Sequence, residues 1–315
     1  MAAGNIQGCK GVVSVSRERV GWIGVGLMGH GAAKNILEKG HPLVVRGNRD
    51  RAPVGDLVAR GAREARDLCE LAASSDVVFL CVPGPAEVER VILGDGGLLA
   101  ALRPGMALVD ATTSDPNLTR RLGAELAARG VVLVDGPLGR TPLQAEAGKL
   151  STFLGGEPEA VARVKPIVAC YADTIIDAGP LGAGHTLKLC NNFISLGTAA
   201  VVSEAVATAA KLGVDLAKLH EVVSAGGANS AMFQMIMPWV LEGDDSKLRG
   251  PFRIGGKDLR TYCRLAEAAP FAAFMAQAAS QIFQLANARG HGERMIPTLP
   301  GILADLNGAK IRDLD

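Results

Sequence analysis

With 315 residues, the chain is longer than one hydrophobic core usually organises, so two domains are the starting expectation. Hydrophobic residues make up 48% of it and aromatic residues only 4%, a balance typical of close-packed helices around a sheet. The 33 basic and 32 acidic residues leave a net charge of +1 and form no long runs, so a nucleic-acid partner or a membrane surface has no electrostatic support. The six cysteines include no CxxC pair, and we expect neither a disulfide framework nor a metal site.

Two segments bear on membranes and on cellular location. The longest apolar run, Phe193 to Ala210, includes Ser195 and Glu204, which favours a buried helix over a transmembrane span. Residues Met1 to Glu18 mix glycine, serine and charged residues without the apolar segment of a signal peptide. The sequence therefore predicts a flexible tail over residues 1–19 and a cytoplasmic protein with no membrane partner.

From Val20 onward, short β-branched runs alternate with longer stretches of helical period, the pattern of βαβ units in an α/β protein. The predicted strands are Val20–Ile23, Leu43–Val45, Val77–Val82, Ala107–Asp110, Val131–Asp135 and Thr152–Leu154. The predicted helices between them are Leu27–Lys39, Pro85–Ile92 and Asn117–Arg129. This alternation predicts a doubly wound parallel sheet of the Rossmann type, which forms an NAD(P)-binding domain over residues 20–182.

After Gly184 the strand signal disappears, and the rest of the chain has the periodicity of helices. These helices are predicted at His185–Leu212, Asp215–Ser224, Met232–Leu241, Lys257–Glu267 and Phe271–Ala288. The first of them is apolar nearly all round, as expected of a helix buried between domains or subunits. The sequence predicts an all-helical C-terminal domain over residues 183–315 that begins with this long interdomain helix.

The strongest local motif is Gly24-Val25-Gly26-Leu27-Met28-Gly29, which follows a predicted strand and opens a predicted helix. In such a motif the first glycine permits a tight turn, the second lets a pyrophosphate approach the backbone, and the third allows close packing of helix and strand. Amide groups at the helix N-terminus then face the anion. We predict that these six residues bind a dinucleotide; the alternative is a glycine-rich turn without a ligand.

The choice between NAD and NADP is usually made at the tip of the second strand, where an acidic residue binds the ribose 2′-hydroxyl of NAD. Here that tip is Arg46-Gly47-Asn48-Arg49, and no carboxylate occurs before Asp50. Arginines bind a 2′-phosphate well, so the sequence favours NADP, with Asn48 and Arg49 as contacts and NAD as the second choice. The alternative is that these arginines belong to a solvated loop.

Four segments, in this order, resemble the β-hydroxyacid dehydrogenase family, and together they span residues 20 to about 270. They are GWIGVGLMGHGAAKNILEKGH, DATTSDP, DGPLGRTPLQAEAGKLSTFLGG and GPLGAGHTLKLCNN. The resemblance implies a Rossmann domain followed by a helical domain. It also places Thr113 and the loop at Val82-Pro83 beside the nicotinamide half of the cofactor, and makes Lys257, in GGKDL, a second lysine that reaches the cofactor.

Lys188 is the predicted catalytic residue. It lies between Leu187 and Leu189 on an otherwise apolar helix, where a charge needs a ligand or a partner. Asn191 and Asn192 follow it by three and four residues, so the three side chains share a helix face and can converge on one substrate. In this role the ammonium protonates a carbonyl oxygen as hydride arrives, and the neutral amine removes the hydroxyl proton in reverse.

The substrate loop departs from the usual family pattern of a serine followed by two glycines, because this chain has Gly139-Arg140-Thr141. This triplet resembles the sulfolactaldehyde reductase branch of the family. An arginine beside a hydroxyl and free backbone amides predicts a socket for a compact anion, either carboxylate or sulfonate. The alternative is a surface arginine in a turn.

The sequence as a whole predicts reversible reduction of a short acid-bearing aldehyde to a hydroxyacid, of the hydroxyisobutyrate, tartronate semialdehyde or sulfolactaldehyde class. The alternatives are an imine reductase, which usually lacks the lysine at position 188, and a non-catalytic dinucleotide-binding protein. His185 and Glu204 are expected to be structural. The many apolar C-terminal helices predict a homodimer or homotetramer.

Overall fold

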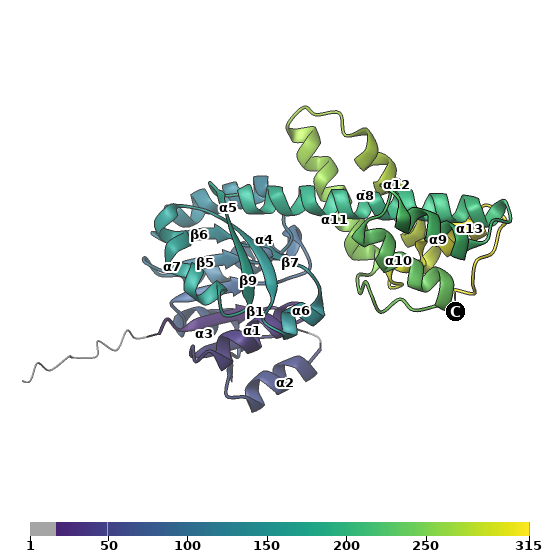
Figure 1. Ribbon diagram of the computed structural model, residues 1–315. Helices are drawn as coiled ribbons and strands as arrows, with labels where there is room; N and C mark the ends of the chain where they lie inside the picture. Colours follow the sequence, from purple (N-terminus) through teal and green to yellow (C-terminus); the bar gives the residue numbers. More distant parts are fainter. Residues whose placement is uncertain (1–16, 49, 315) are drawn as a thin grey trace, which may run out of the picture.

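The computed structural model describes residues 17–48 and 50–314. Figure 1 shows a sheet flanked by helices, a helical part, and one long helix, α8 (Ala183–Lys211), that runs from the first part to the second. The predicted fold class is confirmed by this arrangement, with one difference at an edge of the sheet.

Within the described residues, nine strands form one sheet in the order β3-β2-β1-β4-β5-β6-β8-β7, with β9 also paired to β8. Their bounds are β1 Val20–Ile23, β2 Leu43–Arg46, β3 Arg63–Glu64, β4 Val77–Leu80, β5 Ala107–Asp110, β6 Val132–Asp135, β7 Leu138–Gly139, β8 Leu150–Gly155 and β9 Ala172–Gly179. From β3 to β6 all neighbours are parallel. The carboxyl ends of β1, β4, β5 and β6 therefore lie along one edge of the sheet, where α/β proteins bind ligands.

The expectation of a purely parallel sheet is wrong at the β8 edge. Strand β8 runs antiparallel to β6 and to β7, and only β9 is parallel to it. The connection from β6 to β8 contains the two-residue β7 and the short helix α6 (Pro142–Glu146), which reverse the chain instead of returning it by a long crossover.

The strands are buried on both faces because their alternate residues belong to two different cores. In β4, Val77 and Phe79 pack in one cluster with Trp22, whereas Val78 and Leu80 pack in another. Helices on both faces of the sheet cover these clusters, as Figure 1 shows. The continuous apolar runs of the sequence are thus the strands of a sheet covered on both sides.

The helices of this part are α1 Gly29–Glu38, α2 Ala52–Ala59, α3 Leu68–Ala73, α4 Pro85–Leu93, α5 Pro116–Ala127, α6 and α7 Pro158–Val168, with the 3-10 turn η1 Leu98–Ala100. The three predicted helices correspond to α1, α4 and α5, with ends shifted by at most two residues. The sequence analysis missed α2, α3, α6 and α7, most of which are short.

The helical part follows α8 and contains α9 Leu216–Ala225, α10 Ala231–Glu242, α11 Phe252–Ala268, α12 Phe274–Ala286 and α13 Leu299–Leu306, with short turns η2 Asn287–His291 and η3 Ile296–Thr298. The five predicted helices all occur, whereas α13 was missed. A third core, with Phe233, Trp239, Phe252 and Phe283 among its members, fills the space between these helices and α8.

Helix α8 is long and apolar enough to cross a membrane by length and composition alone, with a mean hydropathy of 1.5 in its most apolar window. The core helix of a folded protein meets the same criteria. Here α8 contributes Leu196, Ala199 and Val206 to the third core, whereas about a third of its most apolar window is buried.

Candidate active site

The glycine-rich turn between β1 and α1 has the geometry that a bound pyrophosphate requires. Gly24 adopts a φ of +93°, and a Cβ there would lie 2.1 Å from the carbonyl oxygen of Cys81. A Cβ on Gly29 would lie 2.0 Å from the carbonyl oxygen of Gly24, so only glycine lets α1 begin against the turn. Gly26 is exposed and has open space around its Cβ position, which leaves the backbone accessible to a ligand. The turn therefore fits the phosphates of a dinucleotide.

The three other residues of the motif have different positions. Val25 is buried in the core, Leu27 is 69% exposed, and Met28 is the N-cap of α1. Leu27 and Met28 were predicted to lie in the helix, which instead begins at Gly29.

Beside the tip of β2 lies a carboxylate, on the neighbouring strand β3, that the sequence analysis overlooked. Asn48 is exposed there, and Arg49 lies outside the described residues. Glu64, in the neighbouring strand β3, pairs with Arg51 at 2.6 Å and lies 3.7 Å from Arg46. The hydrogen bond with Glu64 raises the pKa of Arg51. Two of the arginines near this tip therefore already have an acidic partner.

On the nicotinamide side, Lys257 joins the helical part to the loops that follow β4 and β5. Its Nζ donates to the carbonyl oxygen of Thr113 at 3.0 Å. The side chain of Lys257 also lies against the loop that contains Val82 and Pro83: a Cβ built on Gly84 in this loop would lie 3.0 Å from the lysine Cδ. The residues predicted to lie beside the nicotinamide are thus brought together around one lysine.

Lys188 is 8% exposed, on the second turn of α8. Burial lowers the pKa of its ammonium group, the nearby charge of Asp258 opposes that change, and the charge of Lys257 adds to it. Asp258 is itself buried, and its Oδ1 lies 2.9 Å from Lys257 Nζ. The three charges form one electrostatic group at the junction of α8 and α11.

The two asparagines after Lys188 differ in their surroundings. Asn192 donates from Nδ2 to Asp258 Oδ2 at 2.7 Å, so its amide is held toward the charged group. Asn191 is exposed and donates to Asn192 Oδ1 at 3.4 Å. Helical spacing thus places both amides next to each other, and Asp258 fixes the orientation of one of them.

The predicted substrate loop is held by contacts within the protein. A Cβ on Gly139 would lie 2.3 Å from Ser151 Oγ, which accounts for glycine there. Arg140 has a φ of 73°, a conformation that favours glycine, and its guanidinium donates to Asp173 Oδ1 at 2.7 Å and to Thr174 Oγ1 at 2.9 Å. The hydroxyl of Thr141 donates to Gln144 in a capping box at the start of α6.

The structure therefore assembles Lys188, Asn192, Lys257 and Thr113 into one constellation. Among the described residues, no hydrogen bond or ion pair joins this constellation to the loop at Gly139-Arg140-Thr141, whose role in substrate binding remains a prediction from the sequence. The sequence analysis missed Asp258, although it directly follows Lys257 in GGKDL. Glu64 and Asp173 were also missed, because their pairing with arginines depends on strands that the sequence does not reveal.

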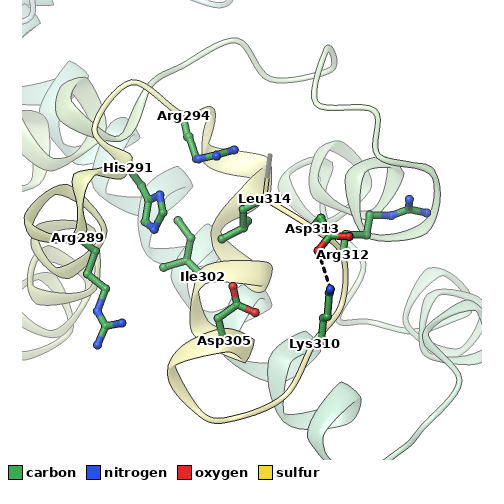
Figure 2. Close-up of a pocket in the computed structure, with 9 residues that line it drawn as sticks. All are labelled: Arg289, His291, Arg294, Ile302, Asp305, Lys310, Arg312, Asp313 and Leu314. Carbon is green, nitrogen blue, oxygen red and sulfur yellow. Dashed lines mark ion pairs between the residues drawn. The ribbon is translucent and has the colours of Figure 1, made fainter.

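A separate pocket of about 420 Å³ lies in the helical part and contains none of these residues. Figure 2 shows basic side chains around it, among them Arg312 and Lys310. Lys310 pairs with Asp313 at 2.6 Å, and Arg312 donates to the carbonyl oxygens of Val240 and Leu241. These cations thus already have partners in the protein.

Comparison with known proteins gives a consistent result along the chain. Residues 19–179 match the NAD-binding domain of 6-phosphogluconate dehydrogenase, and residues 182–296 match the NAD-binding domain of NADP-dependent 3-hydroxyisobutyrate dehydrogenase. A probable mitochondrial 3-hydroxyisobutyrate dehydrogenase-like protein of Arabidopsis thaliana is 32% identical over 94% of this chain and 91% of its own. The 3-hydroxyisobutyrate dehydrogenase of Pseudomonas aeruginosa is 34% identical over 70% of this chain and 74% of its own.

Solved structures show the same relation. The crystal structure of a 3-hydroxyisobutyrate dehydrogenase from Salmonella typhimurium is 28% identical, has a TM-score of 0.80, and matches 90% of this chain and 99% of its own. An imine reductase from Myxococcus stipitatus is more distant, at 20% identity and a TM-score of 0.61 over 90% of this chain and 98% of its own, and this likeness shows the fold alone. The chain belongs to the β-hydroxyacid dehydrogenase family of NAD(P)-dependent oxidoreductases.

Proposed function

We propose that this protein interconverts short acid-bearing aldehydes and hydroxyacids, with Lys188 as the proton donor and acceptor. The observation that carries the proposal is a buried lysine with a lowered pKa, grouped with Asp258, Asn192 and the lysine that contacts the nicotinamide-side loops. Relatives named as hydroxyisobutyrate dehydrogenases support the same substrate class. When bound, the nicotinamide supplies or accepts the hydride at the carbinol carbon.

Lys188 performs the proton step at its Nζ. Because burial lowers the pKa of this group, its neutral form is more accessible than that of a solvated lysine, as oxidation of a hydroxyacid requires. The opposing charge of Asp258 keeps the ammonium form available for aldehyde reduction. The amide of Asn192, oriented by Asp258, is placed to bind a substrate oxygen.

The acid group of the substrate is assigned to the loop at Gly139-Arg140-Thr141, with carboxylate and sulfonate as the two candidate anions. A guanidinium has five N–H donors, and the Arg140 group uses only some of them on Asp173, Thr174 and the carbonyl oxygen of Lys149. Its side chain remains 38% exposed, so a substrate anion can reach it in competition with Asp173.

Two substitutions test that assignment. If Arg140 binds the acid group, Arg140→Gly raises the KM of acid-bearing aldehydes about tenfold, whereas Asp173→Ala lowers it by removing the competing carboxylate. Glycine is the suitable replacement because the backbone has a positive φ at this position. If Arg140 only braces the loop against β9, both substitutions change KM in the same direction, and the assignment is wrong.

For the cofactor we propose a preference for NADP over NAD. The arginine-rich tip of β2 supports it, with Arg49 contributing from sequence position alone. The carboxylate of Glu64 opposes this preference, but Arg51 and Arg46 offset its charge. The side chain of Arg51 is 55% exposed, so a 2′-phosphate can reach it. Arg49→Ala should weaken NADPH binding more than NADH binding, and equal effects would refute the preference.

The alternatives of an imine reductase and a non-catalytic dinucleotide-binding protein are disfavoured by Lys188. A buried amine with no catalytic role would only destabilise the fold. In addition, both parts of the chain match dehydrogenase family models. Assays with NADPH, several semialdehydes and a matched panel of cyclic imines distinguish the three. Aldehyde-dependent oxidation of NADPH that is lost in Lys188→Met supports the proposal; imine-dependent oxidation alone, or none with either panel, refutes it.

We also propose a homo-oligomer, either a dimer or a tetramer, in the cytoplasm. On α8, Leu187, Ile194 and Val201 recur every seven residues and are 43%, 67% and 58% exposed, so they form an apolar stripe along the helix. Light scattering at micromolar concentration tests the assembly, and a monomer would contradict it. Cell fractionation tests the location.

A further inference from the structure

Beneath the start of α8 lies a fully buried polar cluster that the proposed mechanism does not use. It consists of the side chains of Asp110, Thr119, Asp135 and His185, each 2% exposed or less. They come from the ends of β5 and β6, from α5 and from α8. Polar groups that are buried so completely require partners, so their contacts define what the cluster holds together.

Asp135 fixes the first turn of α8. Its Oδ1 accepts the backbone N–H of Gly182 at 2.7 Å, and its Oδ2 accepts that of His185 at 2.7 Å. Both oxygens are acceptors, and both donors are amide groups at the N-terminus of the helix that have no partner within it. Lys188 follows His185 by three residues on the same side of α8, so this carboxylate sets the position from which the lysine extends.

Asp110 fixes the loop on the nicotinamide side. Its Oδ1 accepts the backbone N–H of Thr112 at 3.0 Å, and Thr112 Oγ1 in turn accepts the N–H of Val82 at 3.2 Å. One carboxylate thus organises both chain segments that the cofactor's nicotinamide half is predicted to contact.

His185 lies between the two carboxylates. Its Nδ1 lies 2.8 Å from the hydroxyl oxygen of Thr119 and 3.9 Å from Asp135 Oδ2. Nε2 has no hydrogen-bond partner in the described part of the chain and lies 3.8 Å from Asp110 Oδ2, a separation too long for a hydrogen bond. The imidazole is therefore packed between the two carboxylates and lies against both of the segments that they organise.

We propose that Asp110, His185 and Asp135 form one positioning unit, in which the buried imidazole of His185, packed between the two carboxylates, connects the nicotinamide-side loop to the helix of Lys188. The unit fixes the position of the site of hydride transfer relative to the amine of Lys188. It rests on the proposed role of Lys188, and none of its members touches the substrate. In residues 17–48 and 50–314, the charged groups that face the imidazole are Asp110 and Asp135.

The two carboxylates give opposite expectations for the same substitution. In Asp110→Asn, the amide oxygen still accepts the Thr112 N–H and the side chain keeps its size beside the imidazole, so kcat stays within about threefold of the wild type. In Asp135→Asn, an amide N–H faces a backbone N–H donor, so kcat falls about tenfold or more while the Kd for NADPH is unchanged. Asp110→Ala, which removes both contacts, should lower kcat and also weaken NADPH binding.

The experiment measures kcat, the KM for aldehyde and the Kd for NADPH by titration, together with thermal unfolding, in these three variants and in Lys188→Met. The result that overturns the proposal is an Asp110→Asn variant as damaged as Asp110→Ala, or an Asp135→Asn variant with normal kcat. A Lys188→Met enzyme that still turns over instead refutes the role of the lysine. Should a variant not fold, His185→Gln decides, because a normal kcat without the imidazole contradicts the proposal.

Discussion

Replacing Lys188 by methionine removes the ammonium group but keeps an unbranched side chain of similar length in a buried position. We expect kcat to fall by about 10²–10⁴-fold, the range for loss of a general acid. Binding of the dinucleotide should change little, because the glycine-rich turn and the contact of Lys257 with Thr113 do not involve residue 188.

The same substitution has a definite sign for stability. The pKa of Lys188 is lowered in the folded state, so the unfolded chain binds its proton more tightly, and at neutral pH this group favours unfolding. Methionine removes that contribution. The free energy of unfolding of Lys188→Met at pH 7 should therefore equal or exceed that of the wild type. The lost attraction between Lys188 and Asp258 acts in the opposite direction but is the smaller of the two effects on the pKa.

The assay follows NADPH absorbance with saturating aldehyde, while urea unfolding and NADPH titration are measured on the same preparations. A matched control is Leu187→Met, which changes the neighbouring exposed position on α8 and should leave kcat unchanged. Near-normal turnover in Lys188→Met would remove the lysine from catalysis. A large loss of stability together with the loss of turnover would show that its role is structural.

Three further predictions concern the surroundings of this lysine and the cofactor. The rate of hydroxyacid oxidation should rise with pH as Lys188 loses its proton. It should level off below pH 10.5, the ordinary pKa of lysine, because burial lowers the pKa of Lys188. A pH–rate profile that is flat between pH 6 and 10 contradicts this. Asp258→Asn removes a charge that raises the pKa of Lys188, so the same profile should shift to lower pH, and an unchanged midpoint would refute the coupling. Arg51→Ala releases Glu64 from its ion pair and should reduce the ratio of NADPH to NADH affinity, as measured by paired titrations; an unchanged ratio would show that this pair has no part in cofactor choice.

Much of the fold could be predicted because periodicity is strong where strands are buried on both faces. The bounds of β1 and β5 agree with the prediction residue for residue, since both are short segments that are buried throughout. The missed strands lack that signal: β3 and β7 have two residues each, and most of β9 is exposed or half-buried. The antiparallel edge of the sheet was missed for the same reason, because the direction of β8 depends on its pairing with the two-residue strand β7.

Within the site, the lysines were predictable and their acidic partner was not. Lys188 was conspicuous because an apolar helix surrounds it, whereas Asp258 lies on a helix of mixed composition, where a carboxylate would ordinarily be solvated. Its burial, and its contacts with Lys257 and Asn192, arise only when α11 packs on α8. Arg140 shows the opposite case. Its charge suggested that it binds a substrate anion, whereas in the folded chain its guanidinium pairs with Asp173.

The central claim is that this protein transfers hydride between a nicotinamide and the carbonyl carbon of an acid-bearing aldehyde. The most direct measurement uses NADPH deuterated at C4 of the nicotinamide, in both stereochemical forms, with succinic semialdehyde and sulfolactaldehyde as substrates and butanal as the uncharged control. One form should give a hydroxyacid with a single deuterium on the carbinol carbon, detected by mass spectrometry, and butanal should react much more slowly. NADPH oxidation that leaves no deuterium in the product, or equal rates with butanal, would contradict the account.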